Sequence, residues 1–329
     1  MKQRSIMAGQ CECPVAQCDI HDKAMLQTYR EKRTRWLGWL QADPYHPIWS
    51  QIVALVDEDL MGRTIACAAE NDPESPLHNP MIKRMIVNGH RDAQVLGLRR
   101  LMSKGNNVIS LHRLLSDMKG HSDVFTREIY VAGCGLPYDI SIASASPSLP
   151  NFPSRAIPGS AFVSLDGPYG QSVRSEAAHQ QFDRLSMTTS DTRKRFDRIP
   201  NALFALLEKH IKGSGIDDII KWSHQFIAHP GDATAQGWQD LQITFDKVEV
   251  AQRSIVQVIH LISGAILQGP VLFGIVPVAQ YSRFARLEKM VDPGALKQAR
   301  AKWKELENDR NSWLLSETPR DLLDVIGWA

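Results

Sequence analysis

The spacing of hydrophobic and polar positions predicts a chain built from long amphipathic helices. Apolar residues recur at intervals of three and four, the spacing of one helix face, in residues 23–41, 48–70, 79–104, 108–121, 175–187, 199–212, 214–229, 240–267 and 295–315. No segment alternates apolar and polar residues as a half-buried strand does, and no unit of about 20–50 residues repeats. The pattern therefore predicts an all-α fold, built as a helical bundle.

Local signals mark where several of these helices begin. Pro80 stands just inside the start of its segment, a position that proline favours. Ser110 precedes another helix as a cap, and Ser214, followed three residues later by Asp217, resembles a capping box. Residues 123–133 carry no clear pattern and stay ambiguous. Short loops are expected between most of the helices.

One stretch breaks the helical pattern. Residues 133–170 are rich in proline, serine and glycine, and a connection this long is unusual inside a compact domain. The stretch is either an insertion or a linker, and the predicted layout treats it as an insertion at 133–170. The predicted layout is a cysteine-rich segment at 1–21, the bundle at 22–268, and an extended segment followed by a helix at 269–329.

The longest uncharged run, residues 254–282, is too interrupted to be a membrane span. A span needs about 20 continuous apolar residues, whereas this run contains Gln257, His260, Ser263 and a Gly-Pro break at 269–270. It predicts a buried helix followed by a buried extended segment. No apolar stretch of the secretory type follows the charged start "MKQRSIMAGQ". We therefore expect a cytoplasmic protein with no membrane partner.

Charge is informative only locally. The chain has 38 basic and 36 acidic side chains, a net charge of +2. Residues 77–121, however, are strongly basic and contain only Asp92 and Asp117 as acids. A basic face can hold a phosphate backbone, and the alternative is a solvated helix surface. The candidate RNA-binding residues are Lys83, Arg91, Arg99 and Arg100.

Three of the five cysteines cluster near the N-terminus. The stretch "CECPVAQCDIH" contains Cys11, Cys13, Cys18 and His21, whereas Cys67 and Cys134 stand alone. Three thiolates and one imidazole make an acceptable tetrahedral zinc set, although Cys-x-Cys is not a common finger spacing. The alternative is an unliganded N-terminus, and a disulfide is disfavoured in a reducing compartment. We predict a structural zinc ion at these four residues and no other cofactor.

The stretch "WSHQFIAHPGD" at 222–232 carries the candidate catalytic chemistry. On a helix, His224 and His229 lie about 140° apart, one on each flank of the apolar stripe. Pro230 disfavours α geometry at His229, which makes His229 the last helical residue. The helix dipole favours a protonated imidazole there, suited to acid–base chemistry. The alternative is a histidine that only caps the free carbonyls.

Four stretches in order resemble the HEPN superfamily, and within it the abortive-infection, U-type relatives. They are "QVLGLRRLM" (94–102), "VISLHRLLSDM" (108–118), "IKWSHQFIAHPGD" (220–232) and residues 275–303. The resemblance implies an all-α bundle, metal-independent RNA cleavage in phage defence or toxin systems, and a homodimer whose two motifs face each other. It also implies a partner such as an antitoxin.

The sequence departs from the catalytic motif of that superfamily, which has an arginine, four to six residues, and then a histidine. His229 matches the histidine, but the arginine positions hold His224, Ser223 and Trp222. His224 can stabilise phosphate charge only if it is protonated. An imidazole cannot donate the two parallel hydrogen bonds with which a guanidinium group binds phosphate. We therefore expect His229, with His224, to form a degenerate site with little nuclease activity.

Two hypotheses about function remain open. One is an RNA-binding or RNA-cleaving defence protein, and the other is a non-catalytic helical scaffold for an antitoxin or another defence subunit. The pairs Arg84–His90 and Arg174–His179 also have the motif spacing. Neither pair lies where the resemblance places the site, so both are attributed to chance.

Overall fold

The computed structural model describes residues 13–139, 168–228, 242–314 apart from 271 and 273, and 319–328. These residues form helices and connecting turns without any strand, and one isolated antiparallel bridge joins Thr126 and Arg198. The prediction of an all-α fold is confirmed. The chain divides into two compact units, each built from separate stretches.

The first unit contains the described residues 13–36, 117–139 and 168–204. Its helices are α1 (Lys23–Leu37), α5 (Arg127–Ala132) and α7 (Pro168–Ser186), with the end of α4 (Leu111–Gly120) and the start of α8 (Asn201–Gly213). Its aromatic core centres on Phe125, which stacks on Trp36 with ring centroids 5.3 Å apart and also meets Phe204 at 5.8 Å.

The short helix α5 packs against α7 and explains the stretch that the sequence left ambiguous. The Thr126 side chain caps α5 by accepting from the Ile129 backbone N–H. Arg127 is fully buried and forms ion pairs with Asp183 at 2.7 Å and Asp197 at 3.1 Å. These partners lie far along the chain, so tertiary contacts rather than local periodicity stabilise the helix.

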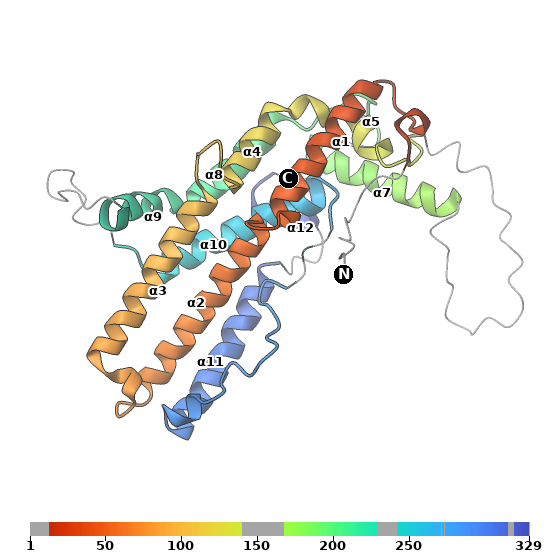
Figure 1. The fold of residues 1–329 in the computed structure, drawn as a ribbon. Helices are drawn as coiled ribbons and strands as arrows, with labels where there is room; N and C mark the ends of the chain where they lie inside the picture. The colour runs from red at the N-terminus through yellow and green to blue at the C-terminus, as the bar shows by residue number, and fades with distance from the viewer. Residues whose placement is uncertain are drawn as a thin grey trace, which may run out of the picture. The chain divides into compact units, whose positions relative to one another are not determined.

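The second unit contains residues 37–116 and the described residues from 205 to 328. Its helices include α2 (Ile48–Glu70), α3 (Pro80–Leu101), α9 (Ile216–Ser223), α10 (Phe245–His260), α11 (Pro293–Ser312) and α12 (Pro319–Val325). Helices α3 and α11 lie on either side of α2, which also packs against α10 (Figure 1). Short π-helical turns extend α9 over His224–Ala228 and α10 over Leu261–Ile266.

The helix starts agree with the sequence signals except at α9. Pro80 opens α3, and Ser110 accepts a hydrogen bond from the Arg113 backbone N–H at 3.1 Å. The capping box predicted at Ser214 is wrong. The Ser214 hydroxyl donates back to the Ile211 carbonyl at 2.6 Å, and α9 begins after Gly215 at φ 80°, a conformation that favours glycine.

The first part of the uncharged run 254–282 is confirmed as a buried helix, but the buried extended segment expected after it is buried only in part, and its described residues from 277 onward are mostly exposed. Beyond the π-helical turn, Leu272, Ile275 and Val276 are buried, and the chain returns to the surface by Val278. Among the residues that the structure describes, no helix has both the length and the apolar character to cross a membrane.

A buried ion-pair network connects four helices of the second unit. Asp59 on α2 has no exposed surface and accepts from Arg63 Nε at 2.9 Å and from Arg310 Nη2, on α11, at 3.1 Å. Arg310, 1% exposed, also binds Glu249 of α10 at 2.7 Å, and His90 of α3 faces Asp59. Burial raises the pKa of Asp59, but the hydrogen bond from His90 and the two guanidinium groups outweigh it and hold that pKa below its usual range.

Replacing Arg310 by alanine is expected to lower the free energy of unfolding by about 3–5 kcal/mol, because it removes a principal partner of a buried carboxylate. Chemical denaturation of the purified chain measures this. Lys302→Ala on the same helix is the matched control, since Lys302 pairs with Glu305 near the surface at 2.8 Å, and should change stability by less than about 0.5 kcal/mol. Similar small losses in both variants would contradict a structural role for the network.

Candidate functional site

An open groove with a volume of about 710 Å³ lies between the C-terminal part of α3 and helix α9. Arg99, Arg100 and Lys104 line it from α3 and the turn that follows. Asp217 and His224 line it from α9 and its π-helical extension. Three cations therefore face a surface histidine across a cavity that is open to solvent.

Two arginines of α3 hold the end of α9 in place. Arg99 Nη1 donates to the Ser223 hydroxyl at 3.4 Å, and Ser223 has no exposed surface. The Arg91 guanidinium lies over the Trp222 ring, 4.8 Å from its centroid. Arg99 is therefore held beside His224 by a contact with the residue that precedes it.

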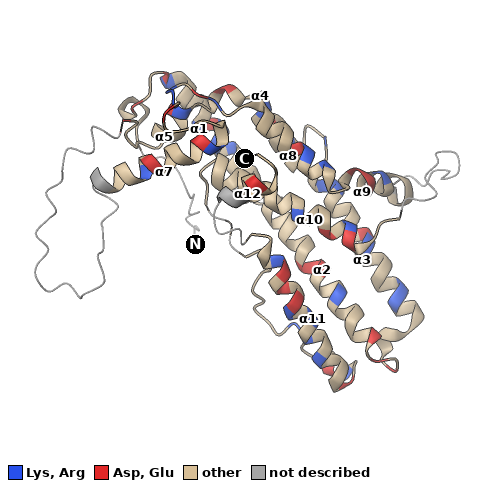
Figure 2. Ribbon diagram, turned by 180° about the vertical axis from the view of Figure 1, so that it is seen from behind, with Lys and Arg blue, Asp and Glu red and all other residues tan. Residues whose placement is uncertain are grey.

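A second hollow adjoins the groove on the side that faces α2. A smaller depression of about 280 Å³ shares Leu96 and Arg100 with the groove and reaches Gln51 and Glu58 of α2. Arg100 thus borders two hollows, and its side chain is exposed. Figure 2 shows basic residues recurring along α3, with Asp92 as the only acid of that helix.

The groove brings together some of the predicted site residues but not all. Arg99, Arg100 and His224 meet there, whereas Arg91 is engaged with Trp222. Lys83 lines a different cavity, and the helical rise places it about 24 Å from Arg99 along α3. The predicted catalytic His229 lies outside the described residues.

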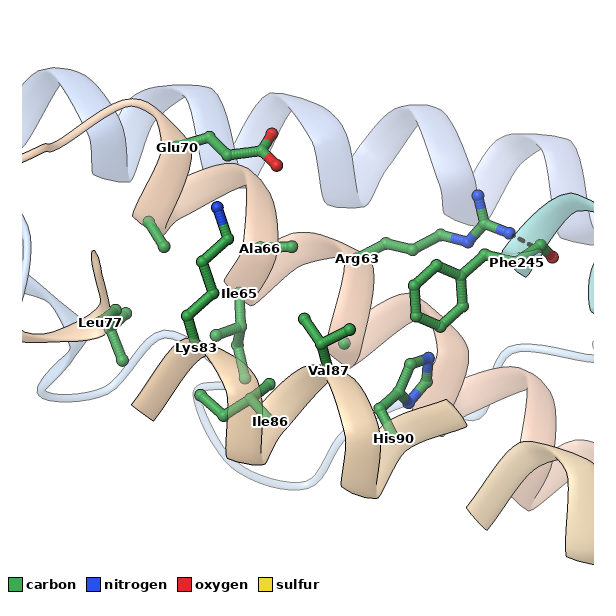
Figure 3. Close-up of a pocket in the computed structure, with 12 residues that line it drawn as sticks. Arg63, Ile65, Ala66, Glu70, Leu77, Lys83, Ile86, Val87, His90 and Phe245 are labelled. Atoms are coloured by element: carbon green, nitrogen blue, oxygen red, sulfur yellow. Dashed lines mark hydrogen bonds between the residues drawn. The ribbon is translucent and has the colours of Figure 1, made fainter. Parts of the chain in front are cut away.

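A second, more enclosed cavity of about 200 Å³ lies between α2 and α3 (Figure 3). Its walls are mainly aliphatic side chains, among them Ile65, Ile86 and Val87. At one end the His90 ring faces the Phe245 ring, with centroids 5.1 Å apart. At the other end the side chains of Lys83 and Glu70 point to the same side of the cavity.

His90 is positioned by two features of α2. Its Nε2 lies 3.4 Å from the buried Asp59 carboxylate. Its ring lies so close to Gly62 that a Cβ there would stand 2.8–2.9 Å from three ring atoms. A carboxylate that orients an imidazole beside an apolar cavity is an arrangement used by general bases. The sequence analysis attributed the Arg84–His90 pair to chance because it lies outside the position that the resemblance gives to the site, and only the packing of α2 on α3 connects His90 to Asp59.

The predicted zinc residues lie in the first unit. Cys13 and Cys18 are free thiols with sulfur atoms 3.3 Å apart, while His21 Nδ1 lies 2.5 Å from the Glu128 carboxylate. Cys11 lies outside the described residues, and Cys134, expected to stand alone, is disulfide-bonded. Within the described ranges no group of three or more His, Cys, Asp or Glu side chains is arranged to hold a metal. The zinc set stays a prediction.

Comparison of the chain with protein-family models, with curated proteins and with solved structures gives no significant match. A function for the chain is therefore inferred from the geometry of the groove and the cavity, together with the motif resemblance of the sequence.

The contact between Gly62 and His90 predicts that Gly62→Ala lowers the free energy of unfolding by about 1–3 kcal/mol, because the added methyl group displaces the imidazole. Gly89→Ala on α3 is the control, since nothing lies within 4 Å of its ideal Cβ, and it should stabilise the helix by about 0.5–1 kcal/mol. Chemical denaturation compares the two variants. Equal stabilisation by both would show that the ring does not lie against α2.

Proposed function

We propose that the second unit binds RNA through its phosphodiester backbone in the groove between α3 and α9. The observation that carries this proposal is the convergence of Arg99, Arg100 and Lys104 on one open cavity. Guanidinium groups bind phosphate oxygens in a fork, and the lysine ammonium adds a compact positive charge. The nearly neutral net charge of +2 makes this concentration of cations a local feature of the surface.

The charge distribution within the groove favours a path for the phosphates along α3. Arg100 is exposed and borders both hollows, so it can contact successive phosphates. Asp217 on the α9 side repels phosphate and keeps the backbone toward the arginines. The base edges would then face away from the cations, which predicts binding with little sequence preference.

Arg99 offers a replacement for the arginine that the motif lacks. Ser223 occupies one of the arginine positions of the motif, and Arg99 contacts its hydroxyl from α3 at 3.4 Å. A guanidinium group from another helix thus lies beside His224, near the start of the stretch that ends at His229. This supports phosphate binding at the motif. A guanidinium already hydrogen-bonded to protein is less free to follow charge developing on phosphate, so we expect cleavage to be slight.

The resemblance adds a biological setting to the proposal. It supports a role in phage defence or as a toxin, with a homodimer as the working form and an antitoxin or another defence subunit as the regulator. The second candidate function is a non-catalytic scaffold for such a protein. Its support is the pair Met81 and Met85, one turn apart near the start of α3, which are 79% and 70% exposed. Exposed methionines suit adaptable protein contacts.

The double variant Arg99→Glu/Arg100→Glu is expected to weaken binding to a single-stranded RNA oligonucleotide and to reduce its salt dependence. Each neutralised phosphate of a single strand contributes about 0.7 to the logarithmic salt slope, so losing two contacts should reduce the slope by about 1.4. Fluorescence anisotropy at several salt concentrations measures both quantities.

The matched control for this experiment is Lys83→Glu/Arg84→Glu, which makes the same charge change at the other end of α3. It should leave the salt slope close to that of the wild type. Equal losses in the two double variants would assign binding to the whole basic helix face. No RNA binding by the wild type would favour the scaffold function.

Cleavage of the same RNA by the wild-type chain is expected to be slow or absent, because loss of one charge-stabilising interaction commonly costs a factor of about 10² or more in rate. Gel analysis of wild type and His229→Ala measures it. Robust cleavage lost in His229→Ala would contradict the degenerate site. Robust cleavage that persists in His229→Ala would show that the catalytic residues lie elsewhere. The variant His90→Ala would then test whether they lie at the second cavity.

A further inference from the structure

The cavity between α2 and α3 has the size of a small-molecule site and shares no lining residue with the basic groove (Figure 3). Its volume is about 200 Å³. An engineered apolar cavity of about 150 Å³ in another protein stays dry and binds benzene. The cavity of this chain therefore has room for one aromatic ring with a short substituent.

The walls between the two ends of the cavity are apolar. Ile65 of α2 and Ile86 and Val87 of α3 line it. Ala69 and Leu77 also line it, and they belong to a buried apolar cluster that extends to α11. A ring that enters the cavity removes its own apolar surface and that of the walls from water, which is the main driving force for binding in such sites.

One end of the cavity presents an imidazole ring in a fixed orientation. The His90 ring lies against Gly62, where a Cβ would stand 2.8 Å from the ring atom Cε1 and 2.9 Å from Cδ2. The Phe245 ring lies nearly parallel to it, at an interplanar angle of 30° and a centroid distance of 5.1 Å. The backbone of α2 and the start of α10 therefore hold the ring in place.

The second nitrogen of His90 is left for a ligand. Nε2 lies 3.4 Å from Asp59 Oδ1, and an ionised carboxylate only accepts, so Nε2 carries a proton. Among the described residues, none forms a hydrogen bond with Nδ1. The neutral ring accepts a hydrogen bond at Nδ1, and the protonated ring donates one. A hydroxyl group can pair with either form, because it both donates and accepts.

The charges around the cavity are balanced, which favours a neutral ligand. Arg63 Nε donates to Asp59 at 2.9 Å, and its Nη2 donates to the Phe245 carbonyl at 2.9 Å. At the other end, the exposed side chains of Lys83 and Glu70 carry opposite charges and point to the same side. An anionic ligand would lose its hydration and would meet Glu70 as well as Lys83.

We propose that this cavity binds a small neutral phenol, a single aromatic ring with one hydroxyl group and at most a short alkyl group. The hydroxyl group pairs with His90 Nδ1, and the ring lies among the aliphatic walls next to Phe245. Lys83 precedes His90 by about 10 Å along α3, so a short alkyl group extends toward the exposed end. The site is independent of RNA binding in the groove.

Isothermal titration calorimetry of the full-length chain with para-cresol, toluene and para-toluate tests the proposal. The wild type should bind para-cresol about 10-fold more tightly than toluene, because toluene leaves the nitrogen of the imidazole unpaired. It should bind the anionic para-toluate more weakly than para-cresol.

The variant Ala66→Leu adds a larger side chain to the cavity wall and should weaken para-cresol binding by about 10-fold or more. Ala54→Leu is the matched control, since it makes the same change at an exposed position of α2 that does not line this cavity. It should bind para-cresol as the wild type does.

The variant His90→Phe keeps a ring and removes the hydrogen-bonding nitrogen. It should bind para-cresol about 10-fold more weakly while its affinity for toluene stays within about 3-fold of the wild type. Circular dichroism establishes that each variant is folded. If His90→Phe does not fold, the wild-type preference for para-cresol and the result for Ala66→Leu decide the matter.

Four outcomes would overturn the proposal. They are no binding of para-cresol by the wild type, equal wild-type affinities for para-cresol and toluene, full binding by folded Ala66→Leu, and equal losses for both ligands in folded His90→Phe. Tighter binding of para-toluate than of para-cresol would also contradict it and would assign the cavity to an anionic ligand held by Lys83.

Discussion

The carboxylate of Asp59 is the constraint on which the second unit depends. An ionised carboxylate without solvent contact costs several kcal/mol unless it is paired, and its partners come from three helices: Arg63 of α2, Arg310 of α11 and His90 of α3. The need to pair the buried Asp59 carboxylate therefore fixes how α3 and α11 pack on α2. Because α3 also carries Arg99, the geometry of the surface groove depends on how His90 of the same helix is held against the buried Asp59 carboxylate of α2.

Local sequence signals predict most of the fold, and the exceptions have a common cause. Apolar periodicity locates the long helices, and Pro80 and Ser110 mark two of their starts. The short helix at Arg127 shows no apolar periodicity in its sequence. It does not depend on an apolar face, because buried ion pairs of Arg127 with Asp183 and Asp197 stabilise it. At Ser214 the local capping pattern is overridden by the turn at Gly215.

The sites were predictable to the extent that their residues are neighbours in the sequence. The basic character of α3 and the histidines after α9 are visible separately, but only the packing of α3 on α9 places Arg99 beside Ser223. The pairing of Asp59 with His90 likewise joins residues that no motif spacing connects. In both cases a side chain on a different helix completes the site.

The most direct test of the account is hydrogen–deuterium exchange of the full-length chain with and without a single-stranded RNA oligonucleotide. The groove predicts slower exchange in residues 96–104 and 216–224, which line it. Residues 62–70 and 83–90 line the second cavity and should exchange at unchanged rates. Protection confined to the second cavity or to the first unit, with residues 96–104 unaffected at saturating RNA, would contradict the assignment of RNA binding to this groove.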